Sequence, residues 1–187
     1  VSAHTVVQRM VEQLGGIEEA TEELAERYRK ALEEQNIAAL LLMISEVHGL
    51  GLEAAQGLYL TESYYWDRND ASREWSNRYR ERTGKMPNMI QAATYSGVLH
   101  YLNAIKAAGT DETEAVAAKM KETPVKDMFA ENGKVLANGR MVSDVYLMEV
   151  KAPADSKGEW DYYTVKATIP GDQAYLAADK SGCPLVK

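Results

Sequence analysis

The sequence has few of the residues on which disulfides and metal sites depend. A single cysteine, Cys183 in SGCPLVK, stands among 187 residues, so the chain forms no internal disulfide and no thiolate cage around a metal. That count leaves the redox compartment open. The histidines form no HxxxH or HExxH pair, which disfavours a metal or acid-base site and favours hydrogen-bonded or solvated side chains for His48 and His100.

Basic clusters and long apolar runs are also missing. The formal net charge of -7 and the pI near 5.1 disfavour nucleic acid and acidic partners, because phosphate binding needs a basic face. The longest strongly apolar run, IAALLLMI at 37–44, is too short to cross a bilayer. The first residues, VSAHTVVQRM, lack a signal-peptide pattern, although a mature chain would have lost one.

The length predicts one globular unit, because 187 residues are few for two independent cores. Residues 1–35 are predicted to form two helices broken at Gly15 and Gly16, each with apolar residues at helical spacing. From residue 36 the sequence becomes richer in apolar residues. The apolar run at 37–44 suits either a strand buried on both sides or the end of a buried helix, and GLYLT at 57–61 is a short strand.

Three helices and a hairpin are predicted for the rest of the chain. The helices are predicted to span 71–82, 89–108 and 112–122. Asn69 or Asp70 caps the start of the first helix, and a glycine closes each of the first two helices. VSDVYLMEVK and WDYYTVKATI then form two strands joined by the turn-prone PADSKGE, a loop longer than a tight two-residue turn. Together these elements predict an α/β or α+β fold.

The order of several longer sequence blocks indicates a protein family more specifically than the spacing of apolar residues does. These blocks occupy 51–70 (GLEAAQGLYLTESYYWDRND), 73–111, 117–153 and 158–175, followed by SGCPLVK. In this order they resemble the C-terminal part of the substrate-binding proteins of branched-chain amino acid ABC transporters, the type I periplasmic binding proteins. The resemblance covers about 36–187. It implies an α/β fold, a single lobe of the type I fold, with the two helices of 1–35 as an N-terminal cap and the hairpin at the C-terminal end.

The resemblance also implies a function. Such receptors have two lobes joined by a hinge, close on a small amino-acid-like or carboxylate solute in the periplasm, and present it to the permease of an ABC transporter. They are not enzymes, and they need no cofactor. They look about twice as long as this chain, so the resemblance predicts a truncated or rebuilt receptor in which residues 1–35 are either a natural remnant or an engineered cap. In similar receptors the cysteine of SGCP-like ends pairs with one in the missing region, so the solitary Cys183 fits excision.

Two site residues follow from the resemblance. Glu46, in ISEVHGLG, lies where similar receptors place an acidic residue at a strand end, against the ammonium group of the solute. Tyr95, in QAATYSGV, resembles a tyrosine whose ring lines the solute cleft. The alternatives are an exposed loop carboxylate for Glu46 and a core tyrosine with a hydrogen-bonded hydroxyl for Tyr95.

A third group of aromatic residues follows in LTESYYWD. By resemblance this segment passes near the hinge and the cleft edge, so Tyr64, Tyr65 and Trp66 are predicted to form an apolar wall for the solute. The alternative, which the burial habits of aromatic side chains favour, is packing against the following helix through Trp75 and Tyr79.

Two hypotheses remain for the whole chain. The first is a solute-binding module, and the second is a non-binding structural scaffold derived from that lobe, with leftover apolar surface that allows a homo-oligomer. An enzyme is disfavoured, because the sequence has no GxSxG elbow, GxGxxG loop or P-loop.

Overall fold

The computed structural model describes residues 38–39, 42–177, 180 and 182, and it divides them into two compact units. The first unit holds the described residues up to Leu60 together with Met148–Thr164, and the second holds Thr61–Leu147 and the described residues from Val165 onward. The chain therefore passes between the units three times. The predicted boundary between residues 35 and 36, the two predicted helices and Cys183 lie outside the described residues.

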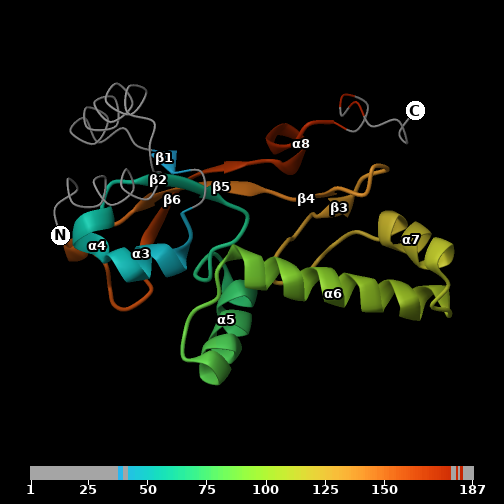
Figure 1. The fold of residues 1–187 in the computed structure, drawn as a ribbon, viewed down its shortest axis with the longest axis horizontal. Helices are drawn as coiled ribbons and strands as arrows, with labels where there is room; N and C mark the ends of the chain where they lie inside the picture. Colours follow the sequence, from blue (N-terminus) through green and yellow to red (C-terminus); the bar gives the residue numbers. More distant parts are fainter. Residues whose placement is uncertain (1–37, 40–41, 178–179, 181, 183–187) are drawn as a thin grey trace, which may run out of the picture. The chain divides into compact units, whose positions relative to one another are not determined.

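Strands and helices both occur, as the α/β prediction requires (Figure 1). The main sheet has the strand order β1-β2-β5-β6, formed by β1 (Ala38–Ala39), β2 (Tyr59–Glu62), β5 (Val145–Val150) and β6 (Tyr163–Ile169). β1 runs parallel to β2, with Ala38 opposite Tyr59. β5 and β6 are neighbours, which confirms the predicted pairing of these two segments, and their long connection includes the 3-10 turn η1 (Pro153–Asp155).

The first unit contains two short helices, α3 (Ile44–Leu50) and α4 (Leu52–Ala55). The apolar run at 37–44 thus contributes both to β1 and to the first residue of α3. Ile44 begins a helix here, which corrects the alternative of the end of a buried helix. Ile44 and Val47 are three residues apart and point into the unit, where they are buried. Burial of these side chains places the rest of α3 at the surface.

The second unit is built around three helices, α5 (Asp70–Thr83), α6 (Met89–Ala108) and α7 (Thr113–Glu122). Local chemistry sets their ends, as predicted. Asn69 Oδ1 accepts the Ser72 N–H at 2.9 Å, while Gly84 and Gly109 close α5 and α6 in the left-handed conformation that glycine tolerates best. α6 packs along α7 (Figure 1).

Three further elements complete the second unit: β3 (Lys134–Val135), β4 (Met141–Val142) and the short helix α8 (Gly171–Ala174). β3 and β4 form an antiparallel pair, with Lys134 opposite Val142. The core of this unit consists of Tyr64, Trp75, Ala92, Val125, Met128, Phe129 and Ala130. Among the described residues, none of the helices is long and apolar enough to cross a membrane.

Arg68 ties this core to its surroundings. Its guanidinium donates to the carbonyls of Met128 and Phe129 at 3.1 and 3.0 Å and to the Tyr146 hydroxyl at 2.9 Å. Its charge also lies over the Tyr146 ring, 5.1 Å from the centroid. The segment between β2 and α5 is held in place by these contacts, and it carries the aromatic residues of LTESYYWD.

Candidate functional site

Glu46 lies in the first turn of α3 and not at the end of a strand, which corrects the placement expected from the resemblance. Its side chain is exposed, and Oε2 accepts the Met43 N–H at 3.0 Å and the Ser45 hydroxyl at 3.1 Å. A carboxylate in this position satisfies a backbone donor at the start of the helix and interacts favourably with the helix dipole. Glu46 therefore has a structural role in α3, and its contact with a solute stays a prediction.

The first unit also holds an aromatic cluster made of His48, Trp160 and Tyr162. The rings of His48 and Trp160 stack with centroids 4.0 Å apart, and His48 Nδ1 lies 2.8 Å from the Tyr162 hydroxyl. Trp160 has a φ of 72°, which is rare for a bulky residue. No local pattern predicts this cluster, because 114 residues separate His48 from Tyr162. Among the described residues, no group of three or more His, Cys, Asp and Glu side chains is placed to hold a metal.

A partly buried ion pair holds the loop that carries Trp160. Lys151 Nζ bonds Asp161 Oδ1, and Asp161 Oδ2 accepts the Lys157 N–H at 2.9 Å. Burial raises the pKa of the Asp161 carboxyl, but the Lys151 ammonium and the Lys157 N–H outweigh it, so the pKa is lower than usual. Asp161 is therefore ionised in the folded chain at neutral pH.

The aromatic residues of LTESYYWD pack in the second unit. Tyr64 is only 1% exposed, lies parallel to Phe129 with ring centroids 6.0 Å apart, and meets the edge of Trp75. Tyr65 is buried as well, and Trp66 is half-buried against the same core. This geometry favours the packing alternative, and a solute wall made by these three residues stays a prediction.

Tyr95 has a different environment. It lies on α6 with 41% of its surface exposed, and its ring centroid is 5.2 Å from that of Trp75. Together with Tyr79 and two arginines of α5, these residues line a shallow pocket of 240 Å³ whose members are Trp75, Arg78, Tyr79, Arg82 and Tyr95. We call it the arginine pocket. Within the described part of the chain, neither Arg78 nor Arg82 forms an ion pair.

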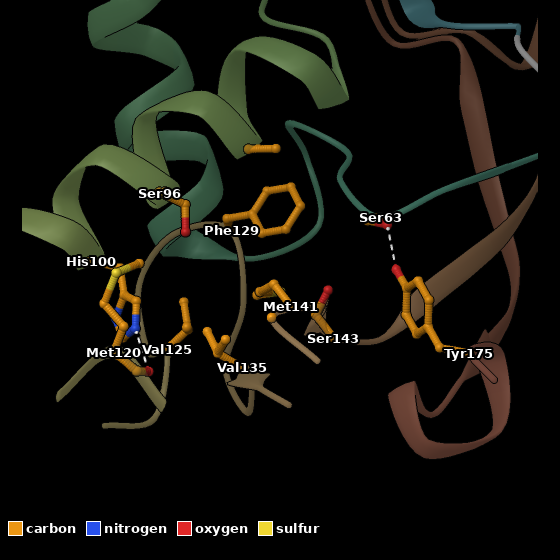
Figure 2. A pocket seen from close by; sticks show the side chains of 13 residues that line it. Ser63, Ser96, His100, Met120, Val125, Phe129, Val135, Met141, Ser143 and Tyr175 are labelled. Atoms are coloured by element: carbon orange, nitrogen blue, oxygen red, sulfur yellow. Dashed lines mark hydrogen bonds between the residues drawn. The ribbon is translucent and has the colours of Figure 1, made fainter. Parts of the chain in front are cut away.

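A second pocket of the same unit has a volume of 340 Å³ (Figure 2). We call it the apolar pocket; it is lined by Ala93, Met120, Val125, Phe129, Val135 and Met141, by two glycines, and by the polar residues Ser63, Ser96, His100, Ser143 and Tyr175. Several of these polar groups are already bonded. Ser96 Oγ donates to Asp127 Oδ2 at 2.6 Å, His100 Nε2 donates to the Met120 carbonyl at 2.9 Å, and the Ser63 and Tyr175 hydroxyls are 3.4 Å apart.

None of the residues predicted to contact the solute lines the apolar pocket. Its walls come from α6, from the β3–β4 pair and from segments far apart in the chain, and no local spacing brings these together. The structure thus places Glu46 in the first unit, Tyr95 in the arginine pocket, and Tyr64 in the core of the second unit.

The periplasmic binding protein family matches residues 18–159, a range that starts before the predicted limit at residue 36. A periplasmic binding protein from Burkholderia mallei is 49% identical, with a TM-score of 0.78, over 80% of this chain and 40% of its own. A branched-chain amino acid ABC transporter periplasmic ligand-binding protein from Burkholderia xenovorans LB400 is 34% identical, with a TM-score of 0.79, over 85% of this chain and 44% of its own. A search of curated proteins found no match.

An amino acid ABC transporter substrate-binding protein from Pseudomonas fluorescens Pf-5 shares the fold, with a TM-score of 0.69 at 22% identity. These findings confirm the resemblance and the type I fold. The family and its solved members are solute-binding proteins and not enzymes. The chain spans less than half the length of these solved structures.

Proposed function

Since the chain belongs to the periplasmic binding protein family of ABC transporters, we propose that it binds an amino acid or a small carboxylate as part of a periplasmic receptor. The receptor would deliver this solute to a membrane permease. Because the chain spans 40–44% of its two most identical solved neighbours described above, the solute contacts proposed here are those that this portion supplies.

The observation that carries the proposal is the environment of Tyr95. In the arginine pocket, Arg78 and Arg82 lie on one helix beside three aromatic rings, with Trp75 and Tyr79 5.6 Å apart between centroids. Guanidinium groups recognise carboxylates through paired hydrogen bonds, and aromatic faces hold the apolar part of a small molecule. This combination suits an organic acid or the carboxylate end of an amino acid.

The other predicted residues keep their proposed roles in modified form. The exposed carboxylate of Glu46 is proposed to attract the ammonium group of an amino acid while it caps α3. Half-buried Trp66 is proposed to contact the solute, and Tyr64 and Tyr65 are proposed to support it from the core.

A thermal melt of the purified chain against amino acids, small carboxylates and the uncharged primary amides of both tests this proposal. A ligand at about 100 times its dissociation constant adds about 2.7 kcal/mol to the free energy of unfolding. For a chain of this size, the midpoint then rises by about 5–10 °C. We expect the shift to be confined to carboxylate-bearing compounds.

Matched variants locate the site. Arg78→Gln and Tyr95→Leu should each reduce the shift, whereas Tyr101→Leu should keep it, because Tyr101 lies on the same helix and is 44% exposed, close to the 41% of Tyr95. Loss of a charge-assisted bond weakens binding by roughly 10- to 100-fold. A cooperative melt that no compound moves, or a shift that survives both site variants, would contradict the proposal.

A further inference from the structure

The apolar pocket is a cavity of the second unit that the proposed carboxylate site does not use. Every residue that lines it belongs to this unit, and its volume of 340 Å³ lies within the range of small-molecule sites (Figure 2). None of these described lining residues is Asp, Glu, Lys or Arg. A charged group bound there would lose its water without gaining a partner of opposite charge, so the pocket suits an uncharged molecule.

Three hydroxyl groups lie at one end of this pocket, where Figure 2 shows Ser63, Ser143 and Tyr175. Ser143 is only 6% exposed, and within the described part of the chain no residue forms a hydrogen bond with its hydroxyl. The Ser63 and Tyr175 hydroxyls are 3.4 Å apart, whereas an ordinary hydrogen bond between hydroxyls measures roughly 2.5–3.0 Å. Because a buried hydroxyl without a partner is costly, this end of the pocket favours a ligand with a hydrogen-bonding group.

The rest of the pocket wall suits an aromatic ring. Phe129 contributes a ring, and Met120 and Met141 contribute flexible side chains whose sulfur atoms make favourable contacts with aromatic groups. An apolar cavity of about 150 Å³ holds one benzene molecule, so a pocket of 340 Å³ has room for a molecule of about two rings. At the far end, His100 Nε2 already donates to the Met120 carbonyl at 2.9 Å (Figure 2). The polar group of a ligand is therefore expected at the end that holds Ser143.

We propose that the apolar pocket binds a small uncharged aromatic alcohol, with its ring against Phe129 and the two methionines and its hydroxyl at Ser143. A hydroxyl both donates and accepts hydrogen bonds, so the ligand can bond the Ser143 hydroxyl whichever way that group points. This site is separate from the arginine pocket, because the two share no lining residue and arginines line only the arginine pocket. The inference therefore goes beyond the proposed carboxylate function and does not depend on it.

Equilibrium dialysis of the full chain against three matched compounds at neutral pH tests this site. Naphthol has the proposed ring and hydroxyl, naphthalene lacks the hydroxyl, and naphthoate carries a carboxylate in its place. We expect naphthol to bind more tightly than naphthalene. Ser143→Ala should weaken naphthol by roughly 3- to 10-fold, the usual effect of one hydrogen bond, and should leave the affinity for naphthalene unchanged.

A second pair of variants locates the binding. Ala93→Leu adds volume at the pocket wall and should remove the binding of naphthol and naphthalene, whereas Ala118→Leu, at an exposed position of α7, should keep it. Thermal melts check that each variant is folded. Absence of naphthol binding would overturn the inference, and so would a Ser143→Ala chain that binds naphthol as tightly as the wild type. Competition between naphthoate and naphthol would also overturn it, because the carboxylate is expected in the arginine pocket.

Discussion

Replacement of Tyr64 by phenylalanine tests the core of the second unit. The Tyr64 hydroxyl donates to the Ser72 carbonyl at 3.1 Å and lies 2.6 Å from Ser76 Oγ, and Ser72 and Ser76 are fully buried. Tyr64→Phe keeps the ring and removes both bonds, so the Ser76 hydroxyl loses a partner away from water. We expect the free energy of unfolding to fall by about 1–3 kcal/mol at pH 8. The melting temperature should then fall by roughly 2–4 °C per kcal/mol.

The pH dependence of this difference is the sharper part of the prediction. Burial raises the pKa of Tyr64 to about 12, because it outweighs the Ser76 hydrogen bond and the Arg68 charge, which lower the pKa. The folded chain therefore holds this proton more tightly than the unfolded chain, whose tyrosines titrate near 10. The corresponding stability is present below pH 10 and is lost as the pH rises from about 10 to about 12. By pH 11 the loss reaches about 1.4 kcal/mol.

Urea unfolding of the wild type and of Tyr64→Phe between pH 8 and pH 11 measures this effect. The advantage of the wild type should shrink by about 1.4 kcal/mol across the range, because the variant has no phenol to ionise at this position. Tyr101→Phe, at a position that is 44% exposed, serves as the matched control. A constant difference between wild type and Tyr64→Phe from pH 8 to pH 11 would refute the assigned burial of this hydroxyl.

Two further changes test the packing of each unit. Asp161→Asn leaves Lys151 without its anionic partner in this partly buried pair, so we expect a loss of about 1–3 kcal/mol at pH 7 in urea unfolding. Because the pKa of Asp161 is lowered, this loss should shrink below about pH 4, and an unchanged loss at pH 3 would contradict the pairing. Gly133→Ala places a Cβ 2.6 Å from Met141 Cε, so we expect it to lower the free energy of unfolding by about 1–3 kcal/mol. Gly97→Ala lies in open space on α6 and should raise that free energy by about 0.5–1 kcal/mol. Equal melting temperatures for the two variants would disprove the crowding at Gly133.

Helix ends were predictable because they depend on residues adjacent in sequence. The predicted helix at 89–108 matches α6 at both ends, and the cap at Asn69 and the closing Gly84 place α5 within one residue of its expected limits. In each case a side chain or a left-handed glycine satisfies backbone groups of the same helix. Glu112 was expected inside the third helix and instead accepts the N–H groups of Glu114 and Ala115 as its N-cap.

The candidate sites were less predictable, because they depend on distant segments. Tyr95 followed from the family resemblance, but the arginines beside it did not, since Arg78 and Arg82 look like ordinary surface residues of α5. The apolar pocket likewise joins residues as far apart as Ser63 and Tyr175. Only the fold brings such residues together, so composition and spacing carry no signal for them.

Helix α6 carries lining residues of both pockets. At one side of the helix, Tyr95 packs against Trp75. At another side, Ala93 and Gly97 line the apolar pocket. Val98 and Leu102 are exposed between these two sides. An amphipathic surface helix would have charges between such contacts, and α6 has one, near its C-terminal end. Solute binding in the arginine pocket therefore depends on the position of α6, because this helix carries Tyr95 against Trp75 of α5.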